Sequence, residues 1–196
     1  MAAFSYRIVN VFTQGRAVLT GNPLCVFERA QALDAQRMQA LALQFNLSET
    51  SFILPSERAS AAVRIFTPRY EMPFAGHPTL GTAHVCRALG LGGDRLTLEL
   101  PVGIITVQAT GERWTLQAKS PAWREVSEPR LTLAAMLGLE ERDLAERPLW
   151  VNAGAEQLVV PLASEAAVRR VNVRADLLAA LGSRLGHGQV YVFAPA

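Results

Sequence analysis

One stretch of the sequence constrains the fold more than any other: a helix whose faces are nearly all apolar or small. It follows Gly76-His77, takes Pro78 as its first residue, and is expected to span 78–90, where Gly90 stops it. A helix on a protein surface carries one polar face, and this segment has none of useful width. The sequence therefore predicts a helix that is buried inside the structure.

Short segments rich in β-forming residues flank the buried helix on both sides in the sequence. They are bounded by Gly, Pro and Asn, which favour turns. The expected strands are 6–12, 24–27, 50–54, 62–66, 96–100, 103–108 and 114–118. The simplest arrangement of these elements is an α+β fold in which an antiparallel sheet curls around the central helix.

A second helix, amphipathic this time, is expected after Asp34. Asp34 can cap it, and its apolar residues at Met38, Leu41 and Phe45 recur on one face. Asn46 can adopt the left-handed conformation that ends a helix. We expect this helix to bury one face only.

A domain boundary is expected around 120–129, where Pro121 and Pro129 bracket a charged stretch. The chain is long enough for one large core or two small ones. We therefore expect a complete N-terminal domain over 1–119 and a second, partial domain over 120–196. Its expected elements are a helix at 131–137, strands at 149–152 and 157–160, a helix at 175–181 and a strand at 189–193. This domain lacks a central helix of its own.

Composition and charge exclude several classes of protein. Hydrophobic residues make up 50% of the chain and charged residues 18%, which excludes a disordered tail or a coiled coil. The net charge is +2 and basic residues form no long run, so nucleic acid is not an expected partner. Neither a leader sequence nor an apolar span is visible, so we expect a cytoplasmic protein that does not bind membranes.

The cysteines indicate neither a disulfide scaffold nor a metal site. There are two, Cys25 and Cys86, and they are too few for the first and too far apart for the second. We interpret them as small buried hydrophobic residues in a reducing compartment. No cluster of ligands for a metal or redox group is visible, so no cofactor is expected.

Glu49 is the first residue with possible chemistry, because it lies at the entry to an apolar strand. One interpretation is a solvated turn residue, or a side chain that bonds to nearby amides. The other is a general acid/base, since a carboxyl group held against an apolar wall can both accept and return a proton. The residues alone leave both interpretations open.

The loop that opens the buried helix is the second candidate. Gly76 allows close approach of the backbone, and the free amides of Gly76 to Thr79, with the helix dipole, favour an anion such as a substrate carboxylate. His77, beside these amides, is expected to be neutral and to donate a hydrogen bond or relay a proton. The alternative is an ordinary helix cap. His84, one turn further on, is expected to be a core histidine.

Four motifs occur in an order that resembles one known family. They are Gly21-Asn22-Pro23-Leu24-Cys25-Val26, Asn46-Leu47-Ser48-Glu49-Thr50, Phe66-Thr67-Pro68 and Phe74-Ala75-Gly76-His77-Pro78-Thr79-Leu80-Gly81-Thr82-Ala83. Together they resemble the PhzF-like isomerase family of phenazine biosynthesis. The resemblance covers essentially the whole chain and is dense up to about residue 90.

The resemblance implies a diaminopimelate-epimerase-like fold with two similar domains and a site in the cleft between them. It implies a cofactor-free isomerase that moves a proton on a small cyclic or amino-acid-like carboxylate; the family's best-known substrate is trans-2,3-dihydro-3-hydroxyanthranilate. Glu49 matches the family's acid/base glutamate and His77 its active-site histidine. The substrate-binding positions implied are Asn22 and the loop residues Gly76, Pro78 and Thr79.

The sequence departs from its relatives at two points. Related epimerases place a catalytic cysteine where this chain has Ala75, which argues against a two-thiol racemase. The family's second helix-opening motif, Asp-Pro-Ala-Thr-Gly-Ser, is absent, so we expect a truncated product or a fragment of a longer protein. A partial domain would expose apolar surface and favour a homodimer. The alternative function is a catalytically silent binding or interaction protein that retains the fold.

Overall fold

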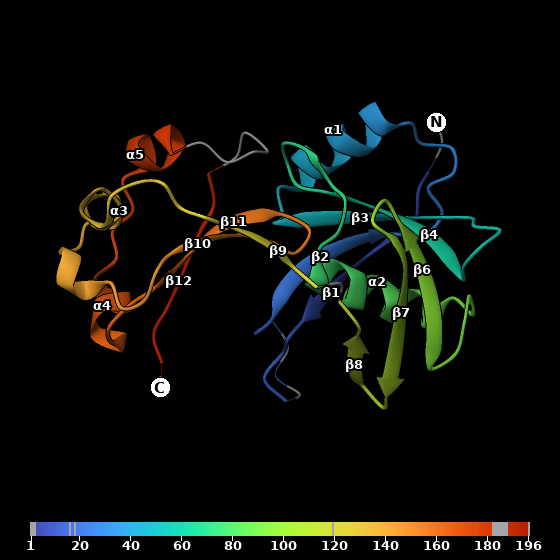
Figure 1. The fold of residues 1–196 in the computed structure, drawn as a ribbon. Coiled ribbons are helices and arrows are strands. Elements are labelled where there is room, and N and C mark those ends of the chain that lie inside the picture. The colour runs from blue at the N-terminus through green and yellow to red at the C-terminus, as the bar shows by residue number, and fades with distance from the viewer. Residues whose placement is uncertain (1–2, 16, 18, 119, 182–187, 196) are drawn as a thin grey trace. The chain divides into compact units, whose positions relative to one another are not determined.

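The computed structural model describes residues 3–15, 17, 19–118, 120–181 and 188–195 of the chain (Figure 1). The chain divides into two compact units, Met1–Lys119 and Ser120–Ala196. Both units mix helices and strands, and each has its own sheet.

The first unit is built on one large sheet. The strands follow the order β1-β2-β3-β4-β6-β7-β8, and β5 pairs with β4. Their bounds are β1 Tyr6–Val11, β2 Asn22–Phe27, β3 Glu49–Leu54, β4 Ala61–Phe66, β5 Glu71–Met72, β6 Arg95–Leu100, β7 Gly103–Thr110 and β8 Arg113–Leu116. The helices of this unit are α1, Ala35–Phe45, and α2, Gly76–Ala88.

Helix α2 is the centre of this unit and confirms the expected buried helix. It contacts β1 and β8, the two edge strands, as well as strands between them, so the sheet curves around it (Figure 1). Gly81 brings the helix close to the sheet, because a Cβ there would lie 2.7 Å from Leu24 Cδ2 and 2.9 Å from Val11 Cγ2. The α+β class with a curled sheet is therefore confirmed.

The bounds of α2 differ from the expected 78–90. The helix begins at Gly76 and ends at Ala88, with Pro78 in its first turn and not at its first position. Proline fits anywhere in the first turn because those amides have no partner within the helix. The sequence signal therefore fixed the first turn but not the first residue.

The sheet is mixed and not purely antiparallel as expected. Most neighbouring strands are antiparallel, but β2 pairs with β3, and β4 with β6, in parallel. A parallel pair needs a long crossover, and α1 supplies it between β2 and β3. The segment that contains α2 supplies it between β4 and β6.

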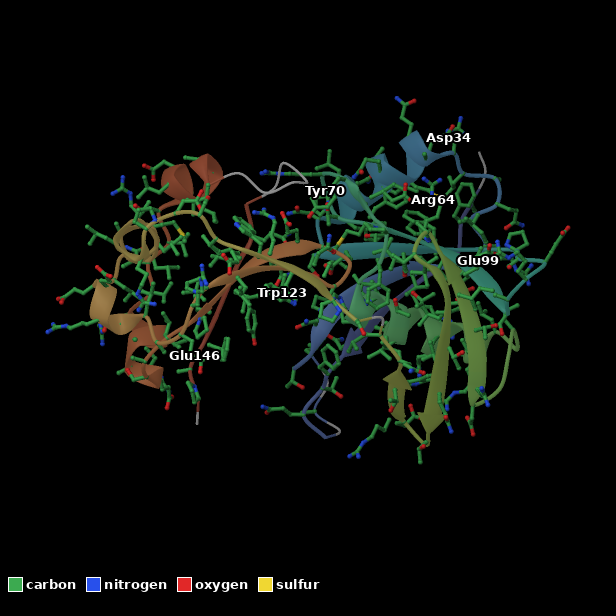
Figure 2. All side chains as sticks on the ribbon, viewed as in Figure 1. Asp34, Arg64, Tyr70, Glu99, Trp123 and Glu146 are labelled. Atoms are coloured by element: carbon green, nitrogen blue, oxygen red, sulfur yellow. The ribbon has the colours of Figure 1, made fainter. Side chains whose placement is uncertain are left out.

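Helix α1 covers the opposite face of the sheet, as its amphipathic pattern predicts. Asp34 caps it by accepting a hydrogen bond of 2.8 Å from the Arg37 amide (Figure 2). Asn46 closes it in the left-handed conformation at φ 51°. Its buried residues join a cluster with strand residues of β2, β3 and β4, which includes Phe27, Phe52 and Phe66.

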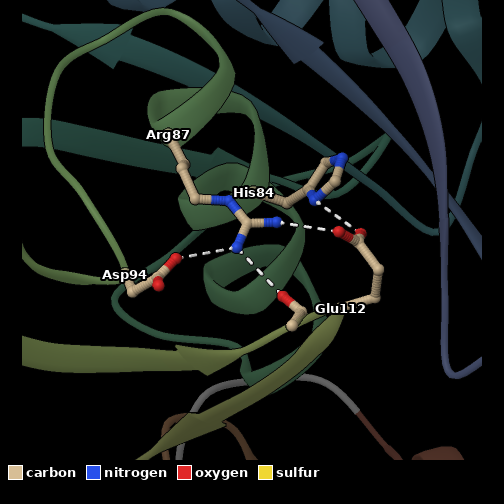
Figure 3. A network of polar contacts seen from close by, with 5 residues as sticks. His84, Arg87, Asp94 and Glu112 are labelled. Atoms are coloured by element: carbon tan, nitrogen blue, oxygen red, sulfur yellow. Dashed lines mark hydrogen bonds and ion pairs between the residues drawn. The ribbon is translucent and has the colours of Figure 1, made fainter.

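A polar network ties the last turns of α2 to the β7–β8 turn (Figure 3). Arg87 bonds to Asp94 and Glu112 at 3.0 and 3.2 Å, and its guanidinium lies over Trp114. His84 Nδ1 lies 3.8 Å from Glu112 Oε2, and the His84 side chain is 42% exposed. The expectation of a core histidine at 84 was wrong, because this face of α2 lies between the two sheet edges and not against the sheet.

The second unit has a smaller sheet with the strand order β12-β11-β10-β9. Its strands are β9 Ala122–Glu125, β10 Leu149–Asn152, β11 Glu156–Pro161 and β12 Val190–Phe193, and its helices are α3 Arg130–Leu137, α4 Glu165–Arg170 and α5 Ala175–Ala180, with a short 3-10 turn at Glu141–Asp143. Residues of α3 and α4 pack on one sheet face around Trp150 and Leu158. Strand β9 and helix α4 were not expected from the sequence, because both are short and rich in charge.

One side of this smaller sheet carries exposed aromatic residues. Trp123, Tyr191 and Phe193 are 65%, 56% and 39% exposed. Figure 2 labels Trp123. On the other side, Arg124 bonds the buried Glu156 through two hydrogen bonds of 3.0 Å and lies over the Trp150 ring. Within the described residues, no helix has the length and apolar character to cross a membrane.

Candidate active site

Three of the sequence motifs meet at one end of the large sheet. Because β2 and β3 are parallel, they begin at the same end, and Glu49 at the start of β3 lies opposite Leu24 of β2. His77, the second residue of α2, lies near both and is hydrogen-bonded to the backbone of Pro23. Segments far apart in the sequence therefore supply one site.

Glu49 and His77 form the centre of the site. Glu49 Oε2 lies 3.4 Å from His77 Nε2, and the two side chains are only 16% and 10% exposed. Both of these atoms are buried and neither has a hydrogen-bond partner. The carboxyl group therefore faces the imidazole directly in a poorly solvated place, which excludes the solvated-turn interpretation of Glu49.

The surroundings of His77 favour its neutral form. Burial lowers its pKa below the ordinary 6.5, while the charge of Glu49 and the bond to Pro23 offset part of this effect. Pro23 has no backbone N–H, so its carbonyl accepts from the ring. His77 Nε2 has no hydrogen-bond partner and faces the Glu49 carboxyl group. A single proton between Oε2 and Nε2 would satisfy both atoms.

The first turn of α2 offers two free amides. Ala75 caps the helix without a side-chain hydrogen bond, and the amides of Gly76 and His77 have no acceptor within the helix. Pro78 has no N–H, and both the amide and the hydroxyl of Thr79 bond to the Ala75 carbonyl, at 3.2 and 2.7 Å. Pro78 and Thr79 are buried, so they shape the loop, and the amides of Gly76 and His77 remain as donors.

Gly76 leaves open space at the start of α2. A Cβ at this position would meet no atom within 4 Å, and the residue is exposed. Asn22 is also exposed, at the first position of β2 opposite Val11. Within the described part of the chain, Asn22 forms no hydrogen bond or ion pair with Glu49 or His77, so its role stays a prediction.

Comparisons with known proteins agree with the motifs. The model of the phenazine biosynthesis-like protein family, PhzC-PhzF, matches residues 9–193. The chain belongs to this family. It is 36% identical over 180 residues to an uncharacterized isomerase of Pasteurella multocida, covering 90% of this chain. It is 41% identical over 143 residues to the trans-2,3-dihydro-3-hydroxyanthranilate isomerase of Pseudomonas aeruginosa, covering 69% of this chain.

Solved structures support the PhzF assignment at the level of the fold. A PhzF-family protein of Bacillus anthracis superposes with a TM-score of 0.84 at 26% identity, over 99% of this chain and 67% of that one. A hydroxyproline epimerase of Agrobacterium vitis shares the fold with a TM-score of 0.52 at 13% identity, over 79% of this chain and 51% of that one. The chain spans 61% and 49% of the length of the two relatives from Pasteurella and Pseudomonas.

The two thiols of this PhzF-family chain lie away from acid-base chemistry. Cys25 and Cys86 are free and buried, and burial raises the pKa of each to about 12. Neither thiol can exchange a proton near neutral pH, and Ala75 stands at the start of α2. This agrees with the sequence argument against a two-thiol racemase. Among the described residues, no group of three or more potential metal ligands is found.

A cavity of about 740 Å³ lies elsewhere on α2 of this PhzF-family chain. It is lined by Val9–Val11 of β1, by Leu80, Gly81 and His84 of α2, and by the β7–β8 turn, and not by Glu49 or His77. Sequence reasoning missed the carbonyl of Pro23, which orients His77. The Gly-Asn-Pro turn identified the segment, but no local pattern reveals a backbone bond across 54 residues of sequence, from Pro23 to His77.

Proposed function

We propose that this protein is an isomerase that moves a proton between two carbon atoms of a small cyclic or amino-acid-like carboxylate. The observation that carries this proposal is the buried approach of Glu49 Oε2 to His77 Nε2, where one proton fits between two unpartnered atoms. Relatives named as isomerases, one of them acting on trans-2,3-dihydro-3-hydroxyanthranilate, support the reaction class.

The proposed mechanism assigns one task to each group. The amides of Gly76 and His77 hold the substrate carboxylate, helped by the dipole of α2. Glu49 takes a proton from one carbon, the electron pair left behind shifts across the neighbouring double bond, and Glu49 returns the proton to the far carbon. While Glu49 holds the proton, its O–H donates to His77 Nε2, the buried atom that faces it.

A second candidate function is a catalytically silent binding protein that retains the fold. The exposed aromatic residues Trp123, Tyr191 and Phe193 favour it, since exposed apolar surface is typical of interaction sites. In that case the amides of α2 would still bind a carboxylate, but no proton would move. A homodimer and a cytoplasmic location stay predictions.

Solvent exchange tests the two functions against each other. The protein is incubated with trans-2,3-dihydro-3-hydroxyanthranilate in D₂O, and deuterium in the recovered compound is followed by mass spectrometry. The isomerase proposal expects incorporation that Glu49→Gln abolishes and that Glu57→Gln, at an exposed glutamate, leaves intact. Calorimetric binding without incorporation would favour the silent protein, and equal incorporation by Glu49→Gln would overturn the role of Glu49.

A further inference from the structure

Glu49 and His77 belong to different elements, so their separation depends on how α2 docks on β3. Glu49 is the first residue of β3, and His77 lies in the first turn of α2. Neither Oε2 nor Nε2 has another partner to hold it in place. The hydrophobic effect that packs a helix on a sheet is not directional, so a directional contact adds to what close packing alone imposes on the position of the helix. A directional contact between the two elements would therefore help to hold the site.

Such a contact exists further along both elements. Ser51 Oγ lies 2.7 Å from Thr82 Oγ1, and both residues are fully buried. Ser51 is two residues after Glu49, so both side chains lie on the same face of β3, towards α2. Phe52, which points the other way, packs in the cluster under α1. The hydroxyl bond and the Glu49–His77 contact thus both join β3 to α2. On α2, His77 and Thr82 are five residues apart and lie about 140° apart around the helix axis, so the two contacts leave the helix in different directions.

The spacing of the two contacts matches on both elements. Two residues of β-strand from Glu49 to Ser51 span about 6.6 Å. Five residues of helix from His77 to Thr82 rise about 7.5 Å. The strand and the helix are therefore attached at two points, which restricts how far α2 can slide or turn relative to β3.

We propose that the Ser51–Thr82 hydroxyl pair positions the acid/base site by holding α2 in register with β3, so that His77 stays in reach of Glu49. This inference rests on the proposed function of the Glu49–His77 pair. A purely stabilising role explains the hydroxyls poorly, because replacing both partners of a buried hydrogen bond by apolar groups of similar shape is nearly neutral for stability. Thr82 could also have bonded to the carbonyl one turn back, as helical threonines commonly do.

The test is the double variant Ser51→Ala/Thr82→Val, which keeps the packing and removes the bond. We expect stability close to that of the parent protein, a kcat for deuterium incorporation that is roughly 10- to 100-fold lower, and little change in KM. The single variant Thr82→Ser keeps both hydroxyl groups, so its kcat should stay near the parental value. Thr50→Val is the matched control, because Thr50 Oγ1 is buried beside Ser51 and has no partner; it should leave kcat unchanged.

A second readout does not need turnover. The imidazole ¹⁵N signals of His77 should shift in the double variant and stay unchanged in Thr82→Ser and in Thr50→Val. Parental kcat together with parental His77 signals in the double variant would overturn the inference. Absence of deuterium incorporation in the parent protein would instead count against the proposed function, and the His77 signals would still decide the inference. Should the double variant unfold, Ser51→Ala alone, which lets Thr82 bond to the Pro78 carbonyl, serves the same test.

Discussion

Glu49 Oε2 faces His77 Nε2 across 3.4 Å, and neither atom bonds to anything else. Two acceptor atoms at this distance repel each other unless a proton lies between them. One proton between Oε2 and Nε2 would satisfy both atoms. This relationship leads to predictions on stability as well as on catalysis.

Replacing Glu49 by Gln should preserve or raise stability while it removes proton transfer. The amide of Gln is close to isosteric with the carboxyl group, and its N–H can donate to the unpartnered Nε2 of His77. We expect a gain of up to about 1 kcal/mol in the free energy of unfolding. Urea denaturation measures it. A loss of more than about 2 kcal/mol would mean that the fold needs the carboxyl group itself.

Replacing Gly76 by Ala should weaken carboxylate binding without harming the fold. The new Cβ meets no protein atom within 4 Å, so it would project into the open space beside the loop that we propose holds the carboxylate. Stability should stay constant or rise by up to about 1 kcal/mol. The control is Gly93→Ala, where a Cβ also meets nothing within 4 Å. Calorimetric titration with trans-2,3-dihydro-3-hydroxyanthranilate should show a loss of affinity for Gly76→Ala and none for Gly93→Ala. Equal affinities of the two variants would contradict the binding role of this loop.

The lowered pKa of His77 should make the fold sensitive to acid. In the unfolded chain His77 takes up a proton near its ordinary pKa of 6.5, whereas in the folded protein it does so only at a lower pH. Its contribution to stability is thus fully present above about pH 6.5 and is lost as the pH falls towards the folded pKa, by at most about 1.4 kcal/mol per pH unit.

Thermal unfolding of the parent protein and of His77→Gln, between about pH 7.5 and about pH 5, measures this effect. The parent should lose stability relative to the variant as the pH falls. A difference between the two proteins that stays constant over this range would show that His77 titrates alike in the folded and unfolded chains.

In the second unit, Arg124→Met should be strongly destabilising. It removes two hydrogen bonds of 3.0 Å from Glu156, whose side chain is 6% exposed. The buried carboxyl group thereby loses the positive charge of Arg124. The expected cost is about 3–5 kcal/mol, measured by denaturation. Arg142→Met breaks an exposed ion pair with Glu140 and should cost no more than about 1 kcal/mol. Equal effects of the two variants would contradict the importance of burial here.

The sequence predicts elements well where the signals are local. Helix α1 begins after Asp34 and ends at Asn46 as expected, because capping depends on residues within one turn. Strand β10 matches its expected bounds, 149–152. The buried character of α2 could be predicted from its composition alone. In contrast, β9 becomes a strand through its pairing with β10, a tertiary effect that overrides weak local preference.

The site could be predicted only in part. Resemblance indicated Glu49 and His77, and the structure brings them together. It could not show that the Thr79 hydroxyl bonds to the Ala75 carbonyl, because that depends on the side-chain rotamer. Nor could it show that the Pro23 backbone lies beside His77, because that depends on the tertiary fold. Asn22 lies exposed at the start of β2, and no local rule decides where an exposed side chain reaches.

The use of the backbone in the first turn of α2 has a consequence for ligand shape. Since Pro78 offers no N–H and the Thr79 amide already bonds to Ala75, two backbone donors remain in this turn, those of Gly76 and His77. A planar carboxylate presents two oxygens and is matched one to one. A tetrahedral phosphoryl group would bring a third oxygen to the same place and find no backbone donor for it. The first turn of α2 should therefore bind a carboxylate in preference to a phosphoryl group.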